Sequence, residues 1–290
     1  MKTFTCSIVM ALVLTMVFAG GGRESGESLL VTAEWLKDNL DRVIVVDYGR
    51  SYEDFQEGHI PGAVYLDRSI FYGERNGIAG MLPDPEDIGA ELGARGIDNK
   101  TTIVMYDSGN NLWASRAFWG FEVLGHRKVR LLDGGFAAWE EFSYPVRMAD
   151  DHRPAATFRV RFQPELIVDS AEILANYENE DFVVLDTRSQ DEYEGSDVRA
   201  NRGGHIPGAV HIDWIKNIDA DGRFETAGTL ATIYDDTIDR NSRVATHCQT
   251  GVRGAHSYFA LRLLGYKNVA LYDGSWVEWG NRDDTPIAFP

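Results

Sequence analysis

The sequence predicts an α/β protein made of two tandem copies of one domain, each a mainly parallel β-sheet with helices on both faces. A seven-residue motif, Gly-His-Ile-Pro-Gly-Ala-Val, starts at Gly58 and recurs letter for letter at Gly204. In both halves, continuous apolar segments of strand length alternate with segments of helical periodicity. Apolar strands without an alternating polar face are typical of a parallel sheet that is covered on both sides.

The composition limits what the protein can be. Its 290 residues are 44% hydrophobic, which suits a folded chain of one or two domains and argues against disorder. With 28 basic and 45 acidic residues the formal net charge is −17, so we expect neither nucleic acid nor an anionic membrane as a partner. The two cysteines, Cys6 and Cys248, are too few for a disulfide scaffold or a multi-cysteine metal site.

Residues 1–22 have the pattern of a secretory signal peptide. A positive start is followed by an almost continuous apolar run from Ile8 to Phe18 and then by small residues. The run is short for a membrane span of about 20 residues, so we expect cleavage after Ala19 and an exported, periplasmic or secreted protein. The alternative is an uncleaved amphipathic helix, and only in that case would this segment associate with a membrane. The segment also resembles a lipoprotein signal, but Gly21 stands where the lipidated cysteine would be.

The first domain is predicted to span residues 27–145, and its elements reappear in the second domain. The apolar strand Val43–Asp47 corresponds to Phe182–Asp186, and both strands end in aspartate. Three further pairs recur at an offset of 140 residues: Leu124-Gly125 with Leu264-Gly265, Asp133-Gly134 with Asp273-Gly274, and Trp139 with Trp279. Several elements repeating in the same order indicate a duplicated domain.

A linker is predicted at residues 146–165, where prolines and charged residues interrupt any periodicity. The second domain, residues 166–290, begins with a helical pattern over Ala171–Tyr177. Strands are predicted at Phe182–Leu185, Val244–Thr246 and Val269–Leu271. Between the last two strands, Gly254–Leu264 has helical apolar spacing and is closed by Gly265 as a cap.

The segment Thr246–Gly254 carries the clearest chemical signal. A short apolar strand leads directly into a loop and a helix, and ligands of open parallel sheets bind at the carboxyl ends of the strands. The loop N–H groups and the helix dipole would form an anion cradle that, with Arg253, stabilises Cys248 as a thiolate. The alternative for Cys248 is a buried small hydrophobic residue, the common fate of a free cysteine. Its loop position beside Gly251 and Arg253 favours the reactive role.

On these motifs the chain resembles the tandem-domain rhodaneses, which are thiosulfate or 3-mercaptopyruvate sulfurtransferases. The resemblance rests on the doubled motif, on Asp186-Thr187-Arg188, and on a six-residue loop from Cys248 to Arg253. It implies that Cys248 carries the sulfur and that the first domain is non-catalytic, since Asp107 occupies the position of the cysteine there. A carboxylate cannot hold a transferable sulfur as a persulfide.

The resemblance also implies two-step covalent catalysis without a metal or an organic cofactor. A small anionic donor would give its sulfur to Cys248, and a thiol or cyanide would remove it. Arg188 and the loop would bind the donor, the loop residues being Gln249, Thr250, Gly251, Val252 and Arg253, and the apolar pair Leu112 and Trp113 would wall the cleft between the domains. The alternatives are an ion pair of Arg188 with Asp186, Asp191 or Glu192, and a core position for Trp113. Glu192 stands where many animal members of the family carry a second arginine.

Several choices stay open. The loop arginine favours a compact dianion, so we expect thiosulfate as the donor, with 3-mercaptopyruvate as the alternative. A cysteine phosphatase would use a similar cradle, but its loop has five residues between cysteine and arginine, and here there are four. A persulfide-binding module without turnover and an inactive tandem protein would share the same fold. The histidines lack metal-ligand spacing, so we expect no metal. His59 and His205 stand in the repeated motif of both domains, which indicates a structural role. We also expect a monomeric protein.

Overall fold

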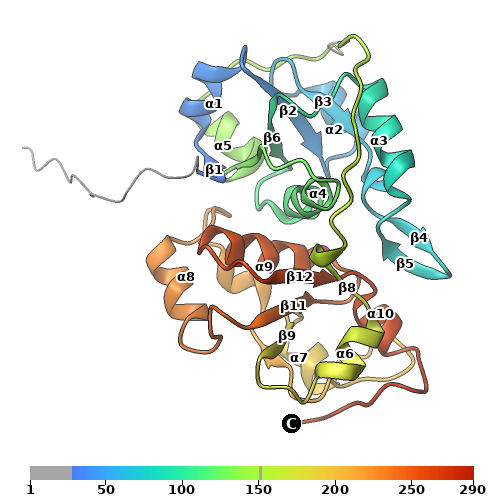
Figure 1. The fold of residues 1–290 in the computed structure, drawn as a ribbon. Helices are drawn as coiled ribbons and strands as arrows, with labels where there is room; N and C mark the ends of the chain where they lie inside the picture. Colours follow the sequence, from blue (N-terminus) through green and yellow to red (C-terminus); the bar gives the residue numbers. More distant parts are fainter. Residues whose placement is uncertain (1–27, 150–151) are drawn as a thin grey trace, which may run out of the picture.

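A computed structural model describes residues 28–149 and 152–290 of the chain. Figure 1 shows two α/β domains stacked on one another, with the first domain above the second. The predicted signal segment, residues 1–22, lies outside the described residues. In the part of the chain that is described, no helix has the length and apolar character needed to cross a bilayer.

The first domain is built on a five-stranded sheet in which every pair of neighbouring strands is parallel, in the order β1-β7-β6-β2-β3. Its strands are β1 (Leu30–Val31), β2 (Val43–Tyr48), β3 (Val64–Leu66), β6 (Thr102–Tyr106) and β7 (Val129–Leu132). A separate antiparallel hairpin consists of β4 (Gly73–Arg75) and β5 (Ile78–Met81). The helices are α1 (Ala33–Asn39), α2 (Tyr52–Glu57), α3 (Pro85–Ala94), α4 (Leu112–Val123) and α5 (Gly135–Glu141).

The second domain repeats this plan with a parallel sheet in the order β10-β9-β11-β12-β8. Its strands are β8 (Ile167–Val168), β9 (Phe182–Asp186), β10 (Val210–His211), β11 (Arg243–His247) and β12 (Val269–Tyr272). The helices are α6 (Ser170–Asn176), α7 (Gln190–Glu194), α8 (Ala227–Tyr234), α9 (Val252–Leu263) and α10 (Ser275–Trp279). The fold class predicted from the sequence is confirmed, and the strand and helix predicted on either side of Cys248 are present.

Three apolar clusters hold the two sheets together. One outer cluster lies between the first sheet and α1, α2 and α5, and another lies between the second sheet and α6, α7 and α10. The central cluster is shared by both domains, because α4 and α9 pack on each other between the two sheets. Most residues of both helices are buried, including polar ones such as Arg116 in α4 and His256 in α9. The two domains therefore share one continuous core.

The doubled motif has the same structural role in each domain. The ring of His59 stacks on Phe55 with centroids 3.8 Å apart, and its Nδ1 lies 2.8 Å from the Phe55 carbonyl oxygen. His205 repeats both contacts with Tyr193, at 3.8 and 3.0 Å. Because the contacts are the same in the domain without a cysteine, the predicted structural role of these histidines is confirmed.

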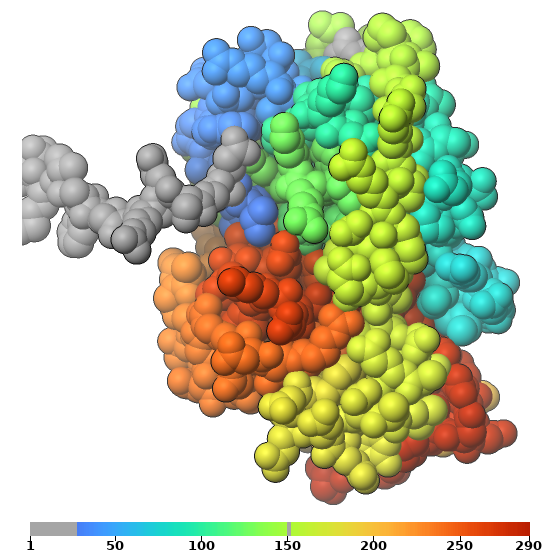
Figure 2. All heavy atoms as spheres, viewed as in Figure 1, coloured from blue at the N-terminus to red at the C-terminus, as the bar shows by residue number. Residues whose placement is uncertain are grey.

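The chain between the domains is fixed along the first domain. The N–H of Ala156 donates to the Gly93 carbonyl (2.9 Å), and the N–H groups of Arg161 and Gln163 donate to carbonyls at the end of α4 (3.0 and 2.8 Å). Figure 2 shows this segment as a yellow-green band of atoms that runs down the surface from the first domain to the second. The linker thus adds contacts to the first domain before it enters β8.

Candidate active site

The second domain places Cys248 where β11 ends, directly before the loop that leads into α9. Cys248 is 1% exposed. Its N–H donates to Ser275 Oγ (3.3 Å), and its carbonyl accepts from the N–H of Trp276 (2.9 Å), so its backbone is held on both sides. Gly251 precedes the helix with a φ of +81°, and a Cβ there would lie 2.8 Å from Arg116 Nη1. Glycine is therefore required at this point of the loop.

The Cys248 side chain has a cationic neighbour. Arg253, in the first turn of α9, interacts with it directly. Burial lowers the pKa of Arg253, but its hydrogen bonds to Glu192, the negative charge of that carboxylate and the interaction with Cys248 hold the pKa above its ordinary value. Although Cys248 is buried, it belongs to none of the three apolar clusters. The site thus combines a buried cysteine, an arginine beside it and the loop that begins a helix.

In the first domain the equivalent strand, loop and helix surround a carboxylate. The carboxylate of Asp107 sits at the head of the loop before α4, and four backbone N–H groups converge on its oxygens at 2.9 to 3.3 Å, those of Gly109, Asn111, Trp113 and Ala114. Asn111 precedes the helix in the left-handed conformation (φ +58°), as Gly251 does in the second domain. The first domain therefore contains an anion cradle that is filled by its own side chain.

Arg188 lies in a buried ion pair beneath the site. Its guanidinium donates to the Asp186 carboxylate at 2.6 to 3.1 Å and to the Gly204 carbonyl at 2.8 Å, and it stacks 4.2 Å above the Trp276 ring. The side chain is 1% exposed. These contacts match the alternative that the sequence left open for Arg188, a pair with Asp186.

The first domain repeats this arginine arrangement. Arg50 Nη1 donates to Asp47 and to the Gly58 carbonyl, both at 2.9 Å, and its guanidinium stacks 4.0 Å from the Phe136 ring. An arrangement that persists where no cysteine is present serves the domain itself. The structure therefore favours the ion-pair alternative for Arg188, and its expected contact with the donor stays a prediction.

Glu192 reaches Arg253 from the first turn of α7. Two parallel hydrogen bonds join Arg253 to the carboxylate, from Nη1 to Oε2 (2.5 Å) and from Nη2 to Oε1 (2.8 Å). Glu192 is 1% exposed, and burial raises its pKa, but the bonds from Arg253 outweigh burial and hold that pKa below the ordinary value. The expected loop cation is thus present beside Cys248, and its charge is matched by a buried carboxylate.

The remaining loop residues bind neighbouring segments. Gln249 Nε2 donates to the Arg199 carbonyl (2.9 Å), and Val252 is buried at the start of α9. Thr250 lies against the β4–β5 hairpin of the first domain, where a Cβ added at Gly80 would come within 2.8 Å of the Thr250 carbonyl oxygen. These loop residues remain predicted donor contacts, and the hairpin supports the loop from the other domain.

Two buried charged residues join the domains behind the loop. Arg116 of α4 donates to Asp273, which follows β12, with Nη1 2.6 Å from Oδ1. The other Asp273 oxygen accepts from the N–H of Leu82, which follows the hairpin, at 2.6 Å. Sequence reasoning missed Arg116, Asp273 and Ser275 as parts of the site. The repeat of Asp-Gly at 133 and 273 was the one signal that marked this position.

The predicted cleft wall belongs, by its contacts, to the first domain. Trp113 makes edge contacts with Tyr48 and Tyr72 and lies 4.3 Å beneath the Arg68 guanidinium. Leu112 is the first residue of α4. Because no contact of either residue with the Cys248 loop is among those described, their role in a cleft remains a prediction.

Histidines near the site are structural by their environment. Burial lowers the pKa of His247 to about 4, so the imidazole is neutral at pH 7, and its Nε2 lies 3.6 Å from Asp186 Oδ2. Within residues 28–149 and 152–290, no group of three or more histidine, cysteine or acidic side chains is arranged to hold a metal ion.

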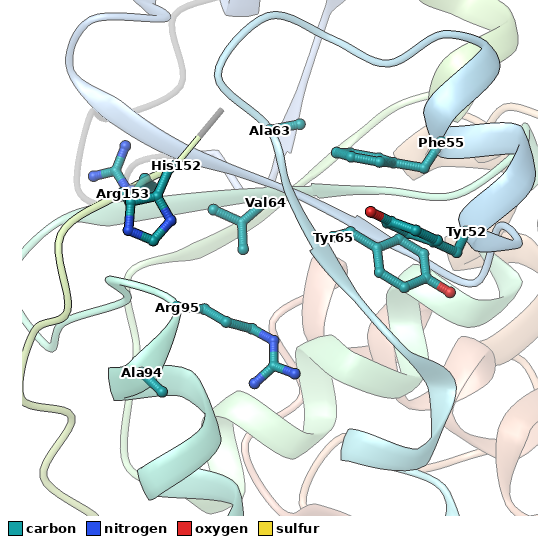
Figure 3. Close-up of a pocket in the computed structure, with 9 residues that line it drawn as sticks. All are labelled: Tyr52, Phe55, Ala63, Val64, Tyr65, Ala94, Arg95, His152 and Arg153. Atoms are coloured by element: carbon teal, nitrogen blue, oxygen red, sulfur yellow. The ribbon is translucent and has the colours of Figure 1, made fainter. Parts of the chain in front are cut away.

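A pocket of about 450 Å³ opens elsewhere, on the outer side of the first domain. Figure 3 shows the aromatic rings of Tyr52, Phe55 and Tyr65 on one side and the side chains of Arg95, His152 and Arg153 on the other. It contains no residue of the loop that carries Cys248. The reactive centre is therefore defined by the loop and its neighbours rather than by this hollow.

Comparison with known proteins identifies relatives across almost the whole chain. The sequence model of a family described as "Rhodanese-like domain" matches twice, at residues 32–142 and 169–282. A "Putative thiosulfate sulfurtransferase" of Mycobacterium leprae is 35% identical over 272 residues, covering 89% of this chain and 97% of the relative. The sulfur carrier protein TtuD of Thermus thermophilus is 33% identical over 276 residues, covering 90% of this chain and 96% of the relative.

Solved structures share the fold. SseA from Escherichia coli, described as a 3-mercaptopyruvate sulfotransferase, superimposes with a TM-score of 0.78 at 28% identity and covers 86% of this chain and 99% of its own. The anaerobic ergothioneine biosynthesis enzyme from Chlorobium limicola gives a TM-score of 0.81 at 24% identity, covering 90% of this chain and 70% of its own. At that identity the second likeness shows the fold alone.

Proposed function

This chain belongs to the rhodanese family of sulfurtransferases, and we propose that it moves a sulfane sulfur from thiosulfate to cyanide or a thiol through a Cys248 persulfide. Two alternatives within the family remain: 3-mercaptopyruvate as the donor, and a persulfide carrier without turnover. The relatives carry names of each kind, thiosulfate sulfurtransferase, 3-mercaptopyruvate sulfotransferase and sulfur carrier.

The observation that carries the proposal is the equivalence of Cys248 and Asp107. Both residues head a loop that follows a central strand and enters a long buried helix. In the first domain the loop N–H groups are aimed at an anion, the Asp107 carboxylate. A thiolate or persulfide at Cys248 would take the place of that anion, and Arg253 beside it adds a positive charge.

The proposed reaction has two half-reactions. The Cys248 thiolate attacks the outer sulfur of thiosulfate, a new S–S bond forms, and the S–S bond of the donor breaks to release sulfite with its electron pair. Cyanide or a thiolate then attacks the outer sulfur of the persulfide and leaves as thiocyanate or as a new persulfide, which restores the Cys248 thiolate. The enzyme alternates between two forms, so ping-pong kinetics are expected.

The test of the proposal is the mass of the intact protein after treatment with thiosulfate. We expect a gain of one sulfur atom on Cys248 that added cyanide removes, together with steady thiocyanate production. Cys248→Ser should lose both while keeping the wild-type unfolding transition. Retained turnover in that variant would remove the nucleophile assignment, and sulfur loading without turnover would establish the carrier alternative. Parallel rates with 3-mercaptopyruvate decide the donor.

We also propose that residues 1–22 direct export of the protein, as their sequence pattern suggests. Sequencing the amino terminus of the protein recovered from the periplasm or the medium tests this. A mature chain beginning near Gly20 supports it, and a cytoplasmic chain that keeps Met1 contradicts it.

A further inference from the structure

The carboxylate that faces Arg253 is held in place independently of the arginine. Glu192 closes a capping box at the start of α7, in which its Oε2 accepts from the N–H of Ser189 (3.2 Å) and from the Ser189 hydroxyl (3.1 Å). The same carboxylate receives the two bonds from Arg253, at 2.5 and 2.8 Å. A carboxylate in the first turn of a helix is also favoured by the helix dipole. Glu192 is thus a fixed negative charge, positioned by its own helix.

The charges beside the thiol therefore cancel. Arg253 contributes one positive charge and interacts with both Cys248 and Glu192, while Glu192 contributes one buried negative charge. Arg199 approaches the Glu192 carboxylate from outside at 3.7 Å, but its side chain is 51% exposed, and Asp197 pairs with it at 2.6 Å. Water and Asp197 screen Arg199. An anion arriving at the loop thus meets an arginine whose charge is already neutralised.

We infer that Glu192 is a specificity-determining residue that sets how strongly this site discriminates among sulfur donors by their charge. The inference rests on the sulfur transfer proposed above. Coulomb energy is proportional to the charge of the donor, so the unfavourable effect of Glu192 on a dianion is twice its effect on a monoanion. Glu192 weakens the binding of dianionic thiosulfate and eases the release of anionic sulfite. It weakens the binding of donors with one negative charge less, so the difference in affinity between the two kinds of donor becomes smaller.

Two donors that have the same shape around the reacting sulfur but different charges can separate the effect of charge on KM from the effect of shape. Thiosulfate carries two negative charges, and methanethiosulfonate carries one, with a methyl group in place of an oxygen. In Glu192→Gln, the amide keeps an acceptor for Ser189 and for Arg253 but removes the charge. We expect the KM for thiosulfate to fall about tenfold and that for methanethiosulfonate about threefold, the square root of the first change. The kcat should change little, and added salt should shrink both effects.

The matched control is Glu194→Gln on the same short helix. Glu194 is exposed, and its described contact is with Gln190 rather than with the loop. Its replacement removes the same charge from the protein and should leave both KM values within the error of the wild type. Inhibition by sulfite supplies a second readout, because its Ki should fall in parallel with the KM for thiosulfate in Glu192→Gln alone.

The double variant of Glu192 and Arg253 tests whether Glu192 acts by cancelling the charge of Arg253. Arg253→Gln leaves Glu192 unmatched and should raise the KM for thiosulfate more than that for methanethiosulfonate, and adding Glu192→Gln should return the ratio of the two KM values to the wild-type value. Equal changes for both donors in Glu192→Gln, or no change, would overturn the inference. If the wild type formed no persulfide with either donor, the proposed function would fail instead. Thermal unfolding of each variant shows that it is folded.

Discussion

Arg188 and Arg50 occupy equivalent positions in the two domains, and only the domain of Arg188 contains the loop cysteine, Cys248. Each guanidinium pairs with the aspartate at the end of a central strand, donates to the first glycine of the repeated motif, and stacks on an aromatic ring. The sequence places an arginine after Asp186 but contains nothing that tells whether it faces outward or folds back. The duplication favours the inward-folded pair, because Arg50 makes the same contacts in the domain that has no cysteine.

Replacing either arginine should therefore cost stability. Removing one partner of a buried ion pair lowers the free energy of unfolding by about 3–5 kcal/mol, because the other charge stays buried without a partner. We expect Arg188→Met and Arg50→Met to lower the free energy of unfolding in urea by similar amounts within that range. At temperatures where the variants are folded, the KM for thiosulfate should stay close to that of the wild type. A large rise in KM for Arg188→Met, with unchanged stability, would restore its role in donor binding.

The element that positions the reaction is a strand, a loop and a helix. The apolar patterns predict a strand at Val244–Thr246 and a helix at Gly254–Leu264. The structure has the strand at Arg243–His247 and the helix at Val252–Leu263. The helix thus begins two residues before the predicted start, because Gly251 in the left-handed conformation directly precedes its first turn. The partner of Arg253 was not predictable as a pair, because Glu192 comes from α7, 61 residues earlier, and only the strand order brings it close.

Gly251 should be the least replaceable position of the loop. Alanine there meets both a positive φ, which costs roughly 1–2 kcal/mol, and the Arg116 guanidinium at 2.8 Å. Gly265→Ala is the matched control, since its φ is +83° and nothing lies within 4 Å of the added methyl group. We expect Gly265→Ala to lose only that backbone cost and to keep its rate of thiocyanate production. Gly251→Ala should lose more stability than Gly265→Ala and should produce thiocyanate at least tenfold more slowly than the wild type. Equal losses in the two variants would contradict a steric clash between the added methyl group and Arg116.

At the scale of the whole molecule, the domains brace each other across the shared core. Arg116 and His256 stand at equivalent places in α4 and α9, and each reaches the opposite domain, Arg116 to Asp273 and His256 to the Asn110 carbonyl (3.2 Å). The duplication, the parallel sheets and the identity of Cys248 could be predicted from repeats and patterns. The packing of the copies could not, because α4 and α9 bury polar residues such as Arg116 and His256 together with apolar ones, so the pattern does not show which face meets the other domain.

His256 gives this interface a pH dependence. Burial lowers its pKa from the ordinary 6.5 to about 3, so the folded protein keeps it neutral while the unfolded chain takes up a proton below pH 6.5. Its contribution is complete above pH 6.5 and is lost as the pH falls, by up to about 1.4 kcal/mol per pH unit. We expect His256→Gln, which can still donate and accept, to flatten by that slope the decline of urea stability between pH 6 and 4. Parallel pH profiles would show that His256 does not titrate in this way.

The α4–α9 contact has a consequence for the role of the first domain. A second domain cut free of the first would present the apolar surface of α9 to water and would lose the hairpin that lies on the Thr250 carbonyl. The first domain therefore acts on the second as one half of an obligate dimer acts on the other, by keeping apolar surface out of water.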